Sequence, residues 1–232
     1  MATQNLDLES QEQLAQLQYF WKRYGNLISA TIIAASLAFL GWQFYQKNAR
    51  NRAAQAAVLY EQLYVAAKTQ DLPKVERTLS DLQHQYGSTA YAEQGVLLAA
   101  AALADSKADA AQAALKWEID HGGQESYRAL ARLRLASLLA QGKKYDEALA
   151  QLNTTLPKAY QALAADRRGD IYMAQNKADL AKAEYRKAYD GMDSEVAYRK
   201  LVGMKLDALG GDPVAQATPA AASASAASSA AK

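Results

Sequence analysis

Residues 27–45 form an apolar run that constrains the fold more than any other feature of the chain. This run contains no charged side chain. As a helix it would be about 28 Å long, close to the ~30 Å hydrocarbon core of a bilayer. Cationic residues border the run on both sides, and aromatic side chains gather at both of its ends, as they do in the interfacial belts of spanning helices. These features predict a single transmembrane helix over residues 27–45.

The run differs from a cleaved secretory signal. The segment before it is long and mildly acidic, and the bulky residues Trp42, Phe44 and Tyr45 stand where a signal peptidase requires small side chains. We therefore expect an uncleaved anchor. The positive-inside rule does not orient this anchor, because two cationic residues (Lys22 and Arg23) lie on its N-terminal flank and three lie on its C-terminal flank.

The anchor also carries a row of small residues. Ala30, Ala34 and Ala38 recur every four residues and therefore line one face of the predicted helix. Helices in lipid associate through small residues that let their backbones approach. Two interpretations stay open: this face contacts a membrane partner, or the alanines only fill a weakly hydrophobic span.

The rest of the chain predicts an all-α fold, because prolines are few and alanines are many. Short breaks at glycine and polar residues divide it into helices at 46–68, 74–86, 89–104, 108–120, 126–140, 144–153, 158–174, 178–189 and 194–209. The Ala/Ser-rich tail at 210–232 has little to bury, and we expect it to be disordered. The net charge of +2 gives no electrostatic signature of nucleic-acid binding, and the absence of cysteine excludes disulfides and thiol chemistry.

A repeat of helix pairs is visible in the spacing of small residues. The pattern consists of a small residue, a second small residue 12 positions later and a larger residue 4 positions after that. It recurs in three units: Ala99, Ala111 and Leu115; Ala136, Ala148 and Leu152; Gly169, Ala181 and Tyr185. The units are offset by 37 and then 33 residues, close to the 34-residue tetratricopeptide repeat. The spacing predicts a tetratricopeptide-like α-solenoid over residues 46–209, although an alanine-rich helical bundle would produce some of these coincidences.

Motifs that carry chemistry are missing from the sequence. His84 and His121 have no ligand-like spacing, and neither a phosphate loop nor a nucleophile motif occurs. We therefore predict neither an enzyme nor a cofactor or metal site. Asp166 and Asp170 stand one helical turn apart beside arginines, a pattern typical of ion-paired helix faces. A weaker hypothesis places Asp166, Asp170 and Met173 on the concave groove in which such repeats hold a peptide or helix.

Several segments together resemble the ancillary SecYEG translocon subunit family (YfgM-like proteins). They are FWKRYGN at 20–26, GWQFY at 41–45, YGSTAYA at 86–92, LRLA at 133–136, DRRGD at 166–170 and MKLDAL at 204–209. The resemblance covers roughly residues 10–209 and leaves out the Ala/Ser-rich tail.

The resemblance implies a non-catalytic protein of the bacterial inner membrane. Residues 1–26 would lie in the cytoplasm and residues 46–209 in the periplasm. Its partners would be the SecYEG translocon, a membrane-anchored chaperone similar to PpiD, and translocating client polypeptides. Two other functions stay open, a scaffold for envelope assembly unrelated to the translocon and a regulatory adaptor that faces the cytoplasm.

Overall fold

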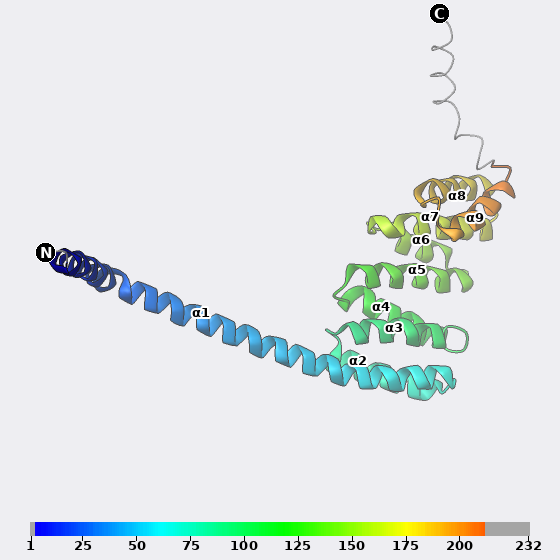
Figure 1. The fold of residues 1–232 in the computed structure, drawn as a ribbon. Helices are drawn as coiled ribbons and strands as arrows, with labels where there is room; N and C mark the ends of the chain where they lie inside the picture. Colours follow the sequence, from blue (N-terminus) through cyan, green and yellow to red (C-terminus); the bar gives the residue numbers. More distant parts are fainter. Residues whose placement is uncertain (1–2, 212–232) are drawn as a thin grey trace, which may run out of the picture. The chain divides into compact units, whose positions relative to one another are not determined.

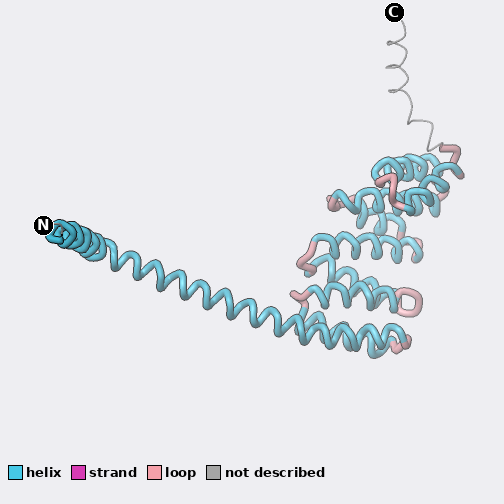
Figure 2. Tube along the Cα trace, viewed as in Figure 1, coloured by secondary structure: helices cyan, strands magenta, loops and turns pink. Residues whose placement is uncertain are grey.

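The computed structural model describes residues 3–211, and the regular elements in this part of the chain are helices (Figures 1 and 2). They are α1 (Thr3–Lys68), α2 (Leu72–Tyr86), α3 (Ala90–Leu103), α4 (Ala108–His121), α5 (Glu125–Gln141), α6 (Tyr145–Leu152), α7 (Lys158–Ala174), α8 (Ala178–Gly191) and α9 (Ala197–Asp207). The all-α fold class is confirmed. The predicted tail lies outside the described residues from residue 212 onward.

The chain divides after Ala54 into two compact units, so that α1 begins in the first and ends in the second. Within the described residues, one stretch of helix, Trp21–Lys68, contains a segment long and apolar enough to cross a membrane, and none of that segment is buried inside the protein. Leu27, Leu37 and Phe39 are each about two-thirds exposed. An apolar helical surface without protein cover suits the lipid contact of a single-pass membrane protein.

The second unit begins at Gln55 and is a stack of antiparallel helix pairs. Each helix from α2 to α9 follows the previous one through a short connection, and α3, α4, α5 and α6 each pack on the next helix. Alternate helices also touch, α3 with α5 and α5 with α7. The first helices of successive pairs therefore form one layer, and α4, α6 and α8 form the other. Helix α9 packs on α8 and closes the stack.

The small residues of the sequence repeat lie where the two helices of each pair cross. All nine residues of the three predicted triplets are buried. Gly169 shows why size matters at these crossings, because a Cβ atom placed on it would lie 2.5 Å from the Tyr185 ring. The tyrosine of the second helix therefore fills the space that the glycine of the first helix leaves. This close approach confirms the repeat register for that pair.

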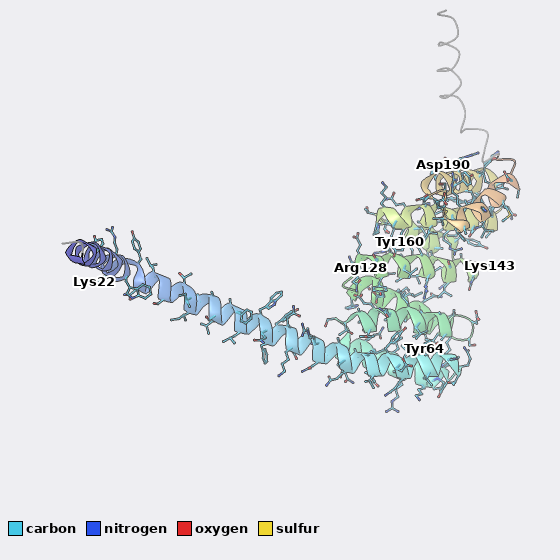
Figure 3. The ribbon with its side chains drawn as sticks, viewed as in Figure 1. Lys22, Tyr64, Arg128, Lys143, Tyr160 and Asp190 are labelled. Atoms are coloured by element: carbon cyan, nitrogen blue, oxygen red, sulfur yellow. The ribbon has the colours of Figure 1, made fainter. Side chains whose placement is uncertain are left out.

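Three of the turns within helix pairs share one backbone geometry that the sequence analysis did not identify. Gln70, Lys143 and Asn176 have positive φ angles of 57°, 59° and 57° (Lys143 is labelled in Figure 3). In each turn the following residue donates its N–H to a carbonyl five residues earlier, at 2.9–3.0 Å. This is the left-handed helix ending that glycine usually provides, here formed by side-chain-bearing residues.

The tight crossing at Gly169 generates a stability prediction. We expect Gly169→Ala to lower the free energy of unfolding by about 1–3 kcal/mol, because the added methyl group overpacks the Tyr185 ring. Chemical unfolding of the full chain in detergent, followed by circular dichroism, measures the change. Gly142→Ala is the matched control, because a Cβ atom there meets its nearest neighbour at an ordinary 3.5 Å. Equal stability of the wild type and Gly169→Ala would contradict the assigned crossing.

Candidate functional site

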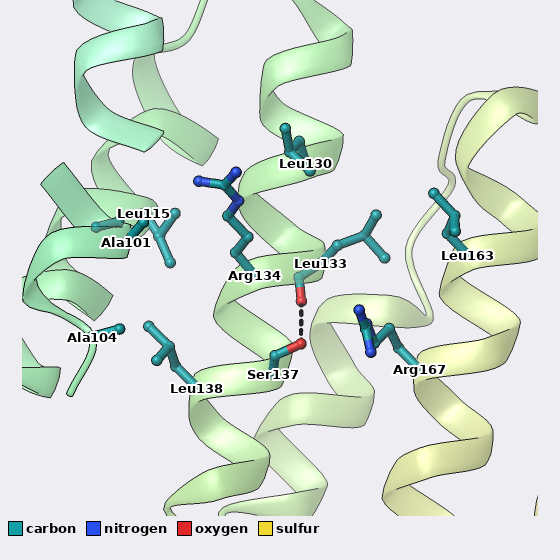
Figure 4. Close-up of a pocket in the computed structure, with 11 residues that line it drawn as sticks. Ala101, Ala104, Leu115, Leu130, Leu133, Arg134, Ser137, Leu138, Leu163 and Arg167 are labelled. Atoms are coloured by element: carbon teal, nitrogen blue, oxygen red, sulfur yellow. Dashed lines mark hydrogen bonds between the residues drawn. The ribbon is translucent and has the colours of Figure 1, made fainter. Parts of the chain in front are cut away.

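An open apolar cavity lies across the layer formed by α3, α5 and α7 (Figure 4). Its volume is about 430 Å³, within the range of small-ligand sites. Alanines of α3 and leucines of α4, α5 and α7 supply most of its lining: Ala100, Ala101, Ala104, Leu115, Leu130, Leu133, Leu138 and Leu163. The lining also includes Ser137 and two arginines. The cavity therefore offers an apolar surface with a few polar groups.

A second cavity of about 270 Å³ extends this surface between α5 and α7. Ser137 and Arg167 line both cavities, so the two are adjacent. Asp170 and Ile171 contribute the α7 side of the second cavity. We call the two cavities together the inner groove. The inner groove is therefore lined by residues of α3, α4, α5 and α7.

Arg134 is a partly buried charge in the inner groove. Its guanidinium donates a hydrogen bond of 2.6 Å to the carbonyl oxygen of Leu97, which joins α5 to α3. Among the described residues no carboxylate lies within ion-pair distance of it. Burial lowers the pKa of Arg134 from its usual value, although an arginine remains charged. The groove thus contains a partly desolvated cation without an anion.

A polar network attaches α9 to α7 and α8. The Asp166 carboxylate is fully buried and accepts hydrogen bonds from the Tyr198 hydroxyl at 2.7 Å and the Lys205 ammonium at 2.8 Å. Lys205 also donates to Asp170 at 2.6 Å, and the Tyr185 hydroxyl donates to the same carboxylate at 2.8 Å. Burial would lower the pKa of Lys205, but these two carboxylates outweigh burial and raise it. The network is structural, because it satisfies the buried charges within the protein.

A second acidic cluster is less well satisfied. Glu118 of α4 is fully buried, and neither of its carboxylate oxygens has a hydrogen-bond partner among the described residues. Glu93 of α3 is nearly as buried, and one of its oxygens accepts hydrogen bonds from the backbone N–H groups of Gly123 and Gln124. Burial is the main cause that raises the pKa of Glu118 to about 7, and the nearby Glu93 carboxylate adds to it while the Arg128 guanidinium opposes it.

Metal ligation is not indicated in the part of the chain that the structure describes. No group of three or more His, Cys, Asp or Glu side chains there could hold a metal ion.

Comparison with known proteins identifies the family. Residues 18–211 match a family model described as a tetratricopeptide repeat-like domain. A Neisseria gonorrhoeae protein named ancillary SecYEG translocon subunit is 35% identical over 204 residues, which make up 87% of this chain and 98% of that protein. The chain belongs to the ancillary SecYEG translocon subunit family.

Two further relatives carry the same name. The Haemophilus influenzae protein is 27% identical over 84% of this chain and 97% of its own length. The Escherichia coli protein is 24% identical over 85% of this chain and 95% of its own length. No solved structure matches this chain. The similarity thus extends over nearly the whole length of these ancillary SecYEG translocon subunits, including the segment that corresponds to the apolar run.

The three residues that the sequence analysis placed in a groove lie in different environments in the structure. Asp170 does line the second cavity, beside Arg167. Asp166 is completely buried against Tyr198 and Lys205 of α9, so its carboxylate does not face the groove. Met173 is 39% exposed and lines neither cavity. Peptide binding at Asp170 and Met173 stays a prediction. Both aspartates are ion-paired, but with Lys205 of α9, and Asp170 also pairs with the neighbouring Arg167.

The row of small residues in the apolar run lies on one face of α1. Ala30, Ala34 and Ala38 are all exposed, on a part of the helix that no other element of the first unit covers. Polar side chains in the same stretch are satisfied locally, since the Thr31 and Ser36 hydroxyls donate to the carbonyl oxygens four residues earlier at 2.8 Å. The helix therefore exposes little polarity to lipid. The role of the alanine face as a contact stays a prediction.

Sequence reasoning missed the residues that line the first cavity. Arg134, Leu130 and Leu163 fall on the first helices of successive pairs, and a search of those helices for residues off the buried crossing face could have found them. Nothing in the local sequence marked Arg134 as enclosed, because its environment comes from α3, 37 positions earlier. The Glu93–Glu118 pair was missed for the same reason.

The buried Glu118 carboxyl predicts a pH-dependent stability. Its pKa is about 7 in the folded protein against 4.5 ordinarily, so its protonated form stabilises the fold at low pH and that contribution is lost as the pH rises to about 7. Glu118→Gln should become more stable relative to the wild type by roughly 2–3 kcal/mol between pH 5 and pH 8, since one pKa unit corresponds to about 1.4 kcal/mol. Chemical unfolding at each pH measures this difference.

Asp120→Asn is the matched control for that measurement, because Asp120 is exposed on the same helix. It shows what the same carboxyl-to-amide change does at the surface of α4. A stability difference between Glu118→Gln and the wild type that does not change with pH would contradict the prediction.

Proposed function

We propose that this protein is a non-catalytic accessory subunit of the SecYEG translocon in the bacterial inner membrane. In this proposal it links the translocation of secreted and envelope proteins to periplasmic chaperones through protein–protein contacts. The observation that carries the proposal is the similarity over nearly full length to relatives named ancillary SecYEG translocon subunit. The match spans both the apolar segment and the repeat region, so it concerns the arrangement of the whole chain.

The proposal gives each part of the chain a task. Residues 27–45 cross the membrane once, with residues 1–26 in the cytoplasm and the repeat domain, residues 46–209, in the periplasm. The membrane span holds the protein beside SecYEG and a membrane-anchored chaperone similar to PpiD. The repeat domain contacts the chaperone and the polypeptides that leave the translocon.

The inner groove supports the binding part of this proposal. Its alanines and leucines offer an apolar surface, and burying such surface contributes about 25 cal/mol per Å². Ordering an extended chain opposes this gain, so a partly open groove favours weak and reversible binding. Reversible binding suits a protein that passes clients to a chaperone, because a tightly held client would not be released.

The orientation has a direct test. Alkaline phosphatase fused after Leu209 should be active, because that enzyme requires the oxidising periplasm to form its disulfides. A fluorescent protein that matures only in the cytoplasm should stay dark at the same position. The reverse pattern would place the repeat domain in the cytoplasm and favour a regulatory adaptor.

The partners can be tested through the anchor. Wild-type protein purified in mild detergent should bring SecYEG and the chaperone with it. Ala34→Ile with Ala38→Ile should remain in the membrane fraction at normal levels, because isoleucine adds hydrophobicity, and should lose most of the copurified partner because its bulk blocks close approach.

Ala35→Ile with Ser36→Ile is the matched control, since it adds similar bulk on other faces of the same exposed helix. This control should copurify its partners as the wild type does. If no SecYEG component copurified with the wild-type protein, that result would contradict the proposed function. Full copurification by the Ala34 and Ala38 variant would place recognition in the repeat domain.

A further inference from the structure

We infer that the inner groove recognises a side-chain carboxylate carried by an apolar segment of polypeptide, with Arg134 as the group that binds the carboxylate. This inference rests on the proposed function, because it names the class of client segment that the repeat domain would hold. It also concerns a property that the fold alone does not require, namely a preference for acidic over neutral or basic segments.

The first argument is the state of the Arg134 guanidinium. A guanidinium has several N–H donors in a fixed planar fork, and only one hydrogen bond, to the Leu97 carbonyl oxygen, joins it to another described residue. Arg134 also lines the first cavity, and none of its nitrogens is enclosed without a hydrogen-bond partner among the described residues. The bond to Leu97 fixes the fork in position before any ligand arrives.

The second argument is the balance of charge along the groove. Figure 4 shows Arg134 reaching from α5 toward α3 and Arg167 reaching from α7 toward α5. Asp170 is the carboxylate of the groove, and it already accepts a hydrogen bond from Lys205 at 2.6 Å and from the Tyr185 hydroxyl at 2.8 Å. Its contact with Arg167 is longer, at 3.3 Å, and both side chains are partly exposed. Arg167 is therefore paired with Asp170, whereas Arg134 has no carboxylate within ion-pair distance among the described residues.

The third argument separates a polypeptide from a small molecule. The walls around Arg134 are alanine and leucine side chains, and an anion that binds there must bring apolar groups to cover them. The second cavity continues the surface past Ser137 and Arg167, so the groove extends beyond the space around one cation. A chain with a Glu or Asp between large apolar residues meets all three features at once. Charge-assisted hydrogen bonds to a partly buried arginine favour this carboxylate over an amide.

Peptide binding to the full-length protein tests the inference. We would use fluorescein-labelled, acetylated nonapeptides of leucine, phenylalanine and alanine that differ only in a central Glu, Gln or Lys. Fluorescence anisotropy with protein in nanodiscs, corrected with empty nanodiscs, gives each dissociation constant. The wild type should bind the Glu peptide about tenfold tighter than the Gln peptide and should bind the Lys peptide more weakly still.

Variants assign the preference to Arg134. Arg134→Met should bind the Glu and Gln peptides equally, and Arg134→Lys should keep part of the preference because its charge remains. Arg132→Met is the matched control, since Arg132 lies on the same helix, contacts Gln151 and does not line the cavity. This control should keep the full preference. If Arg134→Met fails to fold, Ala101→Glu supplies a second variant, because it places a carboxylate on an exposed wall of the same cavity and should abolish the preference.

The outcomes distinguish this inference from the proposed function. Equal binding of the Glu and Gln peptides by the wild type would overturn the inference, and copurification with SecYEG would then still support the proposed function. A Glu preference that survives both Arg134→Met and Ala101→Glu would also overturn it, because the carboxylate would bind elsewhere. A Glu preference abolished by these variants would support the inference, even for a protein that does not copurify with SecYEG.

Discussion

The close crossing of the two helices in each pair is the constraint on which the repeat domain depends. The two helices of a pair carry small residues at buried positions, such as Ala136 and Ala148 in one pair and Gly169 and Ala181 in another. All four residues are buried. Because the second helix comes so near the first, a larger residue one turn later, such as Tyr185, can fill the remaining space. The pair therefore behaves as one rigid unit that can be stacked on the next.

The stacking of these units explains which features could be predicted from the sequence and which could not. The crossing positions and helix boundaries are local in the chain, so their spacing predicted the register of the pairs and the all-α class. The inner groove arises from contacts between alternate helices, α3 with α5 and α5 with α7, whose side chains are more than 30 residues apart. Arg134 and Leu163 could not be assigned to one surface from either local sequence. The misplacement of Asp166 has the same origin, since Tyr198 and Lys205 lie 32 and 39 residues beyond it.

Buried charge is treated in two different ways in this domain. At the end of the stack, Asp166 is compensated by a lysine and a tyrosine, and removal of any one member would leave a costly unpaired group. That network anchors α9, which covers the last pair and limits the stack. In the middle of the stack, and among the described residues, the Glu118 carboxylate has no hydrogen-bond partner and Arg134 has no carboxylate within ion-pair distance. Uncompensated polar groups are costly in a folded chain, and their persistence is typical of sites that a proton or a ligand completes.

Anchoring and weak binding belong together in the function we propose. Ordering an extended segment in a groove that opens to solvent offsets part of the gain from apolar contact, which favours weak binding. A membrane span removes much of this difficulty, since two proteins held in the same membrane near one another encounter each other at a high effective concentration. In the proposed function, the apolar helix therefore does more than locate the protein. It makes a low affinity of the groove sufficient to capture a client segment. The same low affinity permits rapid release, and a fixed cation such as Arg134 would then select among segments without slowing their transfer.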